Sequence, residues 1–147
     1  MRYEELASYQ KSLLSRAESV AKNAYCPYSN FAVGAAILDH QDEIHVGANV
    51  ENAAYGSTLC AERAAIVAAN AQGSRLYKAI AIIAQPRTGV AKNPTAPCGA
   101  CRQMLYEFAS LVEGDIEVIL ANTEKTQILL TRVSELVPLG FGPRDLD

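Results

Sequence analysis

Three cysteines and two charged side chains gather in two short stretches of the sequence. They are Cys60, Glu62 and Arg63 in TLCAERAAI (58–66), and Cys98 and Cys101 in PCGAC (97–101). Cysteines at i and i+3 can direct two sulfurs at one metal ion, and Gly99 relieves the crowding between them. A third ligand is then needed, and Cys60 is the obvious donor. The two stretches can meet only if the helices that begin at each lie side by side on one sheet.

Three thiolates around one ion leave its fourth coordination position open, which is typical of catalytic rather than structural zinc. Glu62 favours this interpretation. A carboxylate two residues from Cys60 is badly placed as a fourth ligand but well placed to handle the protons of a bound water. Arg63 and the two helix N-termini would offset the negative charge of the thiolates. Taken alone, the cysteine pair also fits structural zinc, a redox pair or buried thiols, and Glu62 alone fits a first-turn glutamate stabilised by the helix dipole.

The remaining cysteine and the two histidines are not assigned to this site. Cys26 lies near a turn, and no spacing pairs it with the other thiols, so we expect a small buried residue there. His40 and His45 stand on or beside an expected hairpin, where solvated or packing roles are favoured over ligation. The expected zinc ligands are therefore Cys60, Cys98 and Cys101.

The composition is that of a globular domain rather than of a disordered or fibrous chain. Of the 147 residues, 50% are hydrophobic and 20% are charged, so we expect one domain over 1–147. The formal net charge of −3 provides no basic field that would attract a nucleic acid. The charge therefore favours a small-molecule partner.

The sequence also bears on location. No apolar run approaches the roughly 20 residues that span a bilayer, and the start MRYEELASYQKSLLSR lacks the apolar centre of a signal peptide. We therefore expect a cytoplasmic protein with no membrane partner. In that reducing compartment, metal ligation suits the four cysteines better than disulfides.

The periodicity of apolar residues predicts helices and strands in alternation. The expected helices cover 2–23, about 60–71 and 99–112, and the expected strands cover 31–38, 43–50, 77–84, 115–122 and 127–133, with a short turn or helix at SELVP. The small residues Gly34, Ala35 and Ala36 indicate close approach of another backbone. Helices that follow strands indicate an α/β layered domain around one mixed sheet.

CAER together with PCGACRQ resembles the cytidine deaminases, specifically their small homotetrameric three-cysteine type, and the resemblance runs almost end to end. Four blocks in order support it: YCPYSNFAVGAAIL, NVENAAYG, CRQMLYEF and the ending ELVPLGFGPRDL. The resemblance implies a three-layer α/β/α sandwich around a mixed five-stranded sheet. It also implies zinc-dependent hydrolytic deamination of cytidine and 2′-deoxycytidine to uridine and 2′-deoxyuridine, with release of ammonia, in pyrimidine salvage.

The resemblance further implies a role for each residue that matches the family's motifs. One Zn²⁺ per subunit would be bound by Cys60, Cys98 and Cys101. Glu62 would shuttle protons, and Arg63 would hydrogen-bond the thiolates.

Six residues would contact the substrate in this resemblance. They are Phe31 against the pyrimidine ring, Asn49 and Glu51 on the ribose 3′-hydroxyl, the Ala61 amide on the base carbonyl, Tyr55 lining the site or its subunit interface, and Phe141 entering a neighbouring subunit's pocket. An amide and a carboxylate at i and i+2 of one strand do point the same way, as a shared sugar requires. Phe141 implies a homotetramer with shared active sites.

One stretch departs from the family, and three alternative functions remain. The loop QPRTGVAKNPTAP (85–97) is longer than the family's, and Ala96 replaces a frequent serine beside the base pocket.

The first alternative function is deamination of another aminopyrimidine or of a cytosine-bearing antibiotic, as in the blasticidin deaminases, although NVEN is a sugar-binding feature. The second is deamination of cytosine in RNA or DNA, which the acidic charge disfavours. The third is a zinc-stabilised binding module without catalysis.

Overall fold

Nine regular elements follow one another along the computed structural model, which describes residues 1–147 throughout. They are α1 (Ser8–Ala21), β1 (Phe31–Asp39), β2 (Ile44–Ala48), α2 (Ala61–Ala71), β3 (Tyr77–Pro86), α3 (Gly99–Ala109), β4 (Glu117–Ala121), β5 (Ile128–Arg132) and α4 (Val133–Leu136). Short 3-10 helices cover Tyr3–Glu5, Tyr55–Ser57 and Pro143–Asp145. Every strand and helix expected from the sequence is present, with boundaries that differ by a few residues.

The five strands form one mixed sheet in the order β2-β1-β3-β4-β5. β3 and β4 run parallel, whereas the other neighbouring strands are antiparallel. A parallel pair needs a crossover connection, and α3 provides it. β3 lies in the centre and is buried from Ala79 to Ala84, because its apolar run meets helices on both faces.

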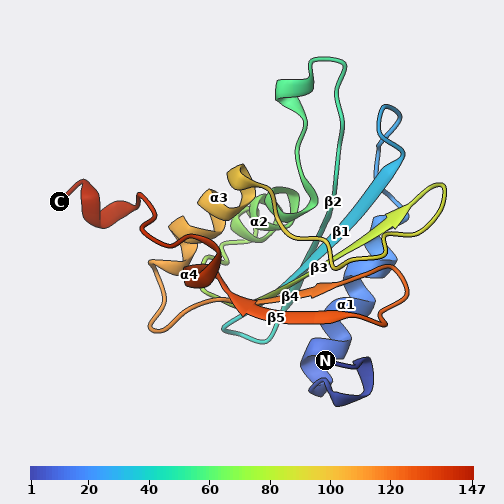
Figure 1. Cartoon of the computed structure of the whole chain (residues 1–147). Coiled ribbons are helices and arrows are strands. Elements are labelled where there is room, and N and C mark those ends of the chain that lie inside the picture. The colour runs from blue at the N-terminus through green and yellow to red at the C-terminus, as the bar shows by residue number, and fades with distance from the viewer.

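Helices cover both faces of this sheet (Figure 1). On one face, α1 packs through Leu13, Leu14 and Ala17 into a cluster of 12 buried apolar residues. On the other face, α2 and α3 contribute to a cluster of 14 buried residues. Each face of the sheet therefore has its own core, and the expected three-layer α/β/α arrangement is confirmed.

Two glycines allow helix backbones to lie directly against the sheet. A Cβ atom on Gly34 of β1 would stand 1.8 Å from the carbonyl oxygen of Ala17 in α1. A Cβ atom on Gly47 of β2 would stand 2.2 Å from the nitrogen of Ala65 and 2.6 Å from the carbonyl oxygen of Ala61 in α2. The close approach expected at Gly34 is confirmed. Gly47 similarly sets how near the start of α2 lies to the sheet.

The N-terminal helix is shorter than its apolar stripe predicts. The expectation of one helix over 2–23 is wrong at its start, because a separate 3-10 turn precedes α1. Gln10 Oε1 accepts a hydrogen bond from the Ala7 amide at 2.9 Å, which caps α1 at this point. Leu6 is extended and joins the same apolar cluster as α1, so burial of this side chain accompanies the break.

Gly34→Ala should destabilise the protein, because its Cβ would collide with a helix carbonyl that cannot rotate away. We expect the free energy of unfolding to fall by about 1–3 kcal/mol, the usual range for overpacking. Urea unfolding measures the change. Gly56→Ala is the matched control, since a Cβ there meets nothing within 4 Å. Equal unfolding free energies for the two variants would contradict this packing.

Candidate metal centre and active site

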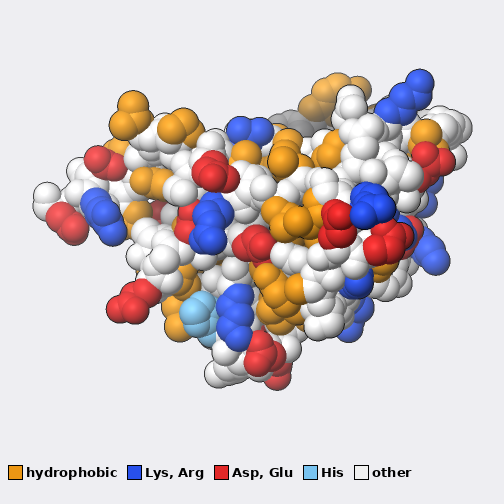
Figure 2. Space-filling view, turned by 60° about the horizontal axis from the view of Figure 1, so that its bottom comes forward, with side chains coloured by type: hydrophobic (Ala, Val, Ile, Leu, Met, Phe, Trp, Pro, Cys, Tyr) orange, Lys and Arg blue, Asp and Glu red, His pale blue; other side chains and the backbone are white.

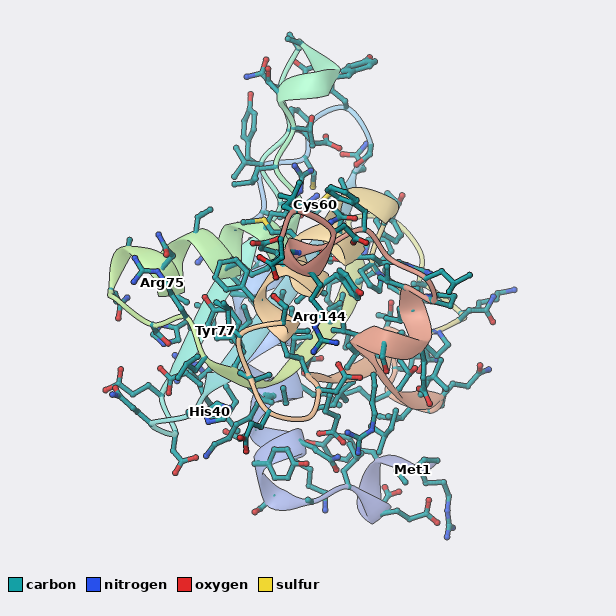
Figure 3. The ribbon with its side chains drawn as sticks, turned by 90° about the vertical axis from the view of Figure 1, so that its left-hand side faces the viewer. Met1, His40, Cys60, Arg75, Tyr77 and Arg144 are labelled. Carbon is teal, nitrogen blue, oxygen red and sulfur yellow. The ribbon has the colours of Figure 1, made fainter.

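Two helix starts bring three thiols together on one face of the sheet. Cys60 is the N-cap residue of α2, Cys98 is the N-cap residue of α3, and Cys101 lies in the first turn of α3. The sulfurs of Cys60 and Cys98 are 3.8 Å apart, and all three lie within 4.8 Å of one another. Figure 3 shows Cys60 in the upper half of the molecule, whereas Met1 and His40 lie in the lower half. The convergence expected from the two motifs is therefore present.

The donor set fits one zinc ion. The group holds three cysteines and no histidine or carboxylate, so no such side chain fills a fourth tetrahedral position. Amides at the starts of α2 and α3 lack intrahelical partners and favour negative groups nearby. Cys101 is fully buried, whereas Cys98 is exposed. In the single chain the site therefore opens toward solvent on the side of Cys98.

Arg63 brings a positive charge to these sulfurs. Its Nη2 donates to Cys60 Sγ at 3.5 Å and to the Thr58 carbonyl oxygen at 3.3 Å. Its Nε is buried without a hydrogen-bond partner, which is costly. Thiols that lose their protons to bind a cation would offer this donor a strongly negative neighbour. The orphaned nitrogen thus fits a metal-thiolate site.

The thiols also influence one another. Hydrogen bonds from Cys101 and Arg63 lower the pKa of the Cys60 thiol to about 5, although burial opposes this. The same hydrogen bond to Cys60, together with burial, raises the pKa of Cys101. The Cys60 thiol therefore loses its proton more readily than a free cysteine and can act as a thiolate ligand.

Glu62 is the buried carboxyl of this region. It lies in the first turn of α2 and is 4% exposed. Burial raises the pKa of Glu62 to about 7, against the effect of a hydrogen bond from its own backbone. Its oxygens are not part of the group of ligand atoms. A carboxyl next to the thiols but outside their cluster has the position of a proton carrier.

Asn49 turns toward β1. Its Oδ1 accepts a hydrogen bond from the Val33 amide at 2.8 Å, and its Nδ2 donates to the Phe31 carbonyl oxygen at 2.9 Å. The side chain thereby continues the hydrogen bonding between β1 and β2 beyond the end of β2 and fixes the backbone around Phe31. A side-chain amide has two N–H groups and two oxygen lone pairs, so Asn49 keeps capacity for a ligand.

Glu51 turns toward the segment that leads into β1. One oxygen, Oε1, accepts hydrogen bonds from the amides of Tyr28 and Ser29 at 3.0 and 3.1 Å, and no protein group donates to Oε2. Val50 pairs with Tyr25 on one side and Leu59 on the other, so the chain is extended here. Asn49 and Glu51 thus both bond backbone groups in or just before β1, and their expected contact with one sugar stays a prediction.

The three aromatic residues predicted for the site are exposed in the single chain. The exposed fractions are 38% for Phe31, 74% for Tyr55 and 61% for Phe141. Tyr55 belongs to the 51–59 loop, which projects away from the sheet in Figure 1, and its ring packs edge-on against Tyr28 with centroids 5.7 Å apart. Phe141 belongs to the tail after α4, which leaves the body beside α3 (Figure 1). One chain alone does not enclose the site with these rings.

Sequence reasoning missed a second polar cluster at the far end of the sheet. Asp39, Glu43 and His45 place ligand-type atoms within 4.8 Å of one another. Asp39 is already saturated, since it pairs with the His45 ring at 2.9 Å and accepts from the Ser74 hydroxyl and from the amides of Gln41 and Glu43. Although burial opposes it, this bonding lowers the pKa of Asp39 to about 2. The cluster ties the β1–β2 hairpin to the turn before β3, and His45 is buried in it and bonded to Asp39.

Arg102 was also missed. It follows Cys101 directly, and its Nε donates to the carbonyl oxygen of Pro97 at 2.8 Å, just before Cys98. Its place in PCGACRQ was the only signal in the sequence.

The surface offers no continuous basic tract on the face in Figure 2, where acidic and basic side chains are interspersed. This distribution agrees with the net charge of −3. None of the helices combines the length and apolar character needed to cross a bilayer.

Comparisons with known proteins agree with the chemistry of the site. The family model described as "Cytidine and deoxycytidylate deaminase zinc-binding region" matches residues 7–112, which include all three clustered cysteines and Glu62. The cytidine deaminase of Sporosarcina psychrophila is 40% identical over 92% of this chain and 93% of its own. That of Halalkalibacterium halodurans is 41% identical over 94% and 98%.

A solved structure gives the same result. The cytidine deaminase of Burkholderia pseudomallei superposes with a TM-score of 0.81 at 37% identity, covering 92% of this chain and 100% of that one. The chain therefore belongs to the cytidine and deoxycytidylate deaminase family, and its clustered cysteines lie in the zinc-binding region of that family.

Proposed function

We propose that this chain catalyses the hydrolytic deamination of cytidine and 2′-deoxycytidine to uridine and 2′-deoxyuridine, with release of ammonia. The observation that carries the proposal is the buried Glu62 carboxyl beside a three-sulfur group that lacks a fourth protein ligand. A purely structural zinc site would not need this carboxyl and would normally have four protein ligands. The relatives named cytidine deaminase support the same reaction.

Cys60, Cys98 and Cys101 would hold one zinc ion in each subunit. When bound, zinc supplies a Lewis acid that makes water a nucleophile near neutral pH. Three thiolates would leave the site with a net charge of about −1, which opposes this activation. Arg63 and the amide ends of α2 and α3 offset that charge.

Glu62 would carry the protons of the reaction. It accepts a proton from the attacking water and donates it to ring nitrogen N3 while the water oxygen bonds to C4. A second proton passes from the new hydroxyl group through Glu62 to the amino group on C4. The C4–N bond then breaks and ammonia leaves. Cytidine and water thus become uridine and ammonia with no other reagent.

The substrate would be held by groups that still have bonding capacity. Asn49 and Glu51 would share the ribose 3′-hydroxyl, Asn49 through its remaining amide capacity and Glu51 through Oε2. The Ala61 amide lies at the start of α2, where helix amides lack intrahelical partners, and would donate to the base carbonyl. Phe31 would pack on the pyrimidine ring. Fixing the sugar in this way would hold C4 within reach of the water.

The active site would be completed by other copies of the chain in a homotetramer. Catalysis of this kind is strongest where water is excluded, yet Cys98 and Phe31 are open to solvent in the single chain. Tyr55 belongs to the loop that projects away from the sheet, and Phe141 is exposed on the tail beside α3, so both rings could enclose a neighbour's site. We assign Phe141 to the pocket of a neighbouring subunit.

A substrate panel tests the proposed reaction. The purified protein is incubated in parallel with cytidine, 2′-deoxycytidine, cytosine, CMP and a cytosine-containing oligonucleotide, and the loss of ultraviolet absorbance is followed. Both nucleosides should react. Cytosine lacks the ribose contacts, and the Glu51 carboxylate should repel the phosphate of CMP. Reaction with CMP alone would contradict the ribose assignment. No ammonia from any compound would favour a zinc-stabilised binding module.

A complementation experiment tests whether Phe141 acts in a neighbour's site. Glu62→Gln alone should lose at least about 10²-fold in activity through loss of the proton carrier, and Phe141→Ala should also be impaired. In mixed oligomers of the two variants, about a quarter of the sites would combine an intact Glu62 with a neighbour's Phe141. Activity should therefore reappear on mixing.

The control mixes Phe141→Ala with the Glu62→Gln/Phe141→Ala double variant, in which no chain can supply Phe141. This mixture should show no more activity than its Phe141→Ala chains contribute alone. If the first mixture also fails to regain activity although mixed oligomers form, Phe141 does not act between subunits.

A further inference from the structure

A single guanidinium group links the metal loop to the C-terminal tail. Arg102 lies in the first turn of α3, directly after Cys101. Its Nε donates to the Pro97 carbonyl oxygen at 2.8 Å, and its Nη1 donates to the Leu136 carbonyl oxygen at 3.3 Å. Pro97 immediately precedes Cys98, and Leu136 is the last residue of α4. The same side chain therefore contacts the loop that carries one sulfur and the start of the tail.

On the loop side of this link, residues 87–98 form no helix or strand. Hydrogen bonds tie the loop at Arg87, Ala91 and Lys92, whereas from Asn93 to Pro97 the bond from Arg102 is the one hydrogen bond that holds the approach to Cys98. Pro97 has no amide to donate, and its carbonyl is the group that Arg102 holds. Arg102 therefore holds the residue that precedes Cys98, and its amide also donates to the Cys98 carbonyl oxygen.

The tail side carries further contacts with the same helix. Gln103 Nε2 donates to the Phe141 carbonyl oxygen at 2.9 Å. Gly140 and Gly142 lie so close to Tyr106 of α3 that a Cβ would stand 3.0 and 2.7 Å from its ring. These contacts hold the tail by its backbone along α3. The side chains of Leu139 and Phe141 remain exposed.

We propose that Arg102 is a positioning residue that couples the Cys98–Cys101 metal loop to the placement of Phe141. The inference rests on the proposed function for the part Phe141 plays, and it goes beyond that function by joining the metal site of one subunit to the ring it offers its neighbour. Gln103 holds only the tail. Arg102 and Gln103 therefore form a matched pair. Arg102 contacts both the metal loop and the tail, whereas Gln103 contacts the tail alone.

Arg102→Lys keeps the charge but loses the fork of donors that reaches two carbonyl oxygens at once. We expect zinc release to a chelator to become about tenfold faster, as when a group that supports a ligand is lost. Amide hydrogen exchange over 137–142, read by mass spectrometry, should also become faster. The KM for cytidine should rise about fivefold, as expected for one lost hydrogen bond, with a smaller change in kcat. Gln103→Ala should speed exchange in the tail and raise KM but leave zinc release unchanged.

A double-mutant cycle separates positioning from general loosening of the fold. If Arg102 acts on substrate binding through Phe141, then adding Arg102→Lys to Phe141→Ala should raise KM no further, although zinc release should still be faster. Additive effects on KM would overturn the coupling. So would a change in only one of zinc release and tail exchange in Arg102→Lys, or in neither. Arg102→Gln carries the same expectations and replaces Arg102→Lys if that variant does not fold.

Zinc release and tail exchange need no turnover. If the wild-type protein deaminates no cytosine compound, the proposed reaction is wrong, but these two measurements still decide whether Arg102 joins the two segments.

Discussion

The structure depends on holding three sulfur atoms within 4.8 Å of one another at the starts of two separate helices. Thiolates repel one another, so this arrangement is favourable only with a cation among them and positive groups around them. Arg63 and the amide ends of α2 and α3 are those groups. The sheet supplies the geometry, because β2 and β3 each lead into a helix on the same face. Gly47 lets α2 lie against β2 at Ala61, the residue next to Cys60.

The two ends of the molecule differ in how completely their polar groups are hydrogen-bonded within the chain. At one end, Asp39 is saturated with hydrogen bonds and closes the β1–β2 hairpin. At the other, Arg63 Nε has no partner, Glu51 Oε2 receives no protein hydrogen bond, and Phe31 is exposed. The buried donor without a partner costs stability, and it lies with the accessible Glu51 oxygen and the exposed ring where a metal ion and a nucleoside would bind.

Much of the site could be predicted from the sequence because its signals are local. The spacing of Cys98 and Cys101, the neighbouring Cys60, Glu62 and Arg63, and the i, i+2 relation of Asn49 and Glu51 each follow from the geometry of one element. The apolar run of β3 likewise predicted burial, and the small residue Gly34 predicted the close approach of another backbone. The layered fold brings the two cysteine stretches together. The periodicity of apolar residues in strands and helices was enough to predict that fold.

Other features could not be predicted, because they are contacts between distant side chains and backbone atoms. The hydrogen bonds from Asn49 to β1, from Ser74 to Asp39 and from Arg102 to Leu136 join residues 16 to 35 positions apart. Backbone carbonyls and amides exist at every residue, so such partners leave no pattern in the sequence. The break before α1 could not be predicted for a related reason. The apolar stripe counted Leu6 as helical, whereas its burial is achieved by an extended link.

We expect the three cysteine sulfurs to bind one zinc ion and a solvent oxygen to occupy its fourth position. X-ray absorption at the zinc edge of the purified protein tests it directly, because the scattering distinguishes sulfur from lighter ligands. We expect three sulfur neighbours at about 2.3 Å and one oxygen at about 2.0 Å. Four sulfur neighbours, or a histidine nitrogen in place of a sulfur or of the oxygen, would contradict it.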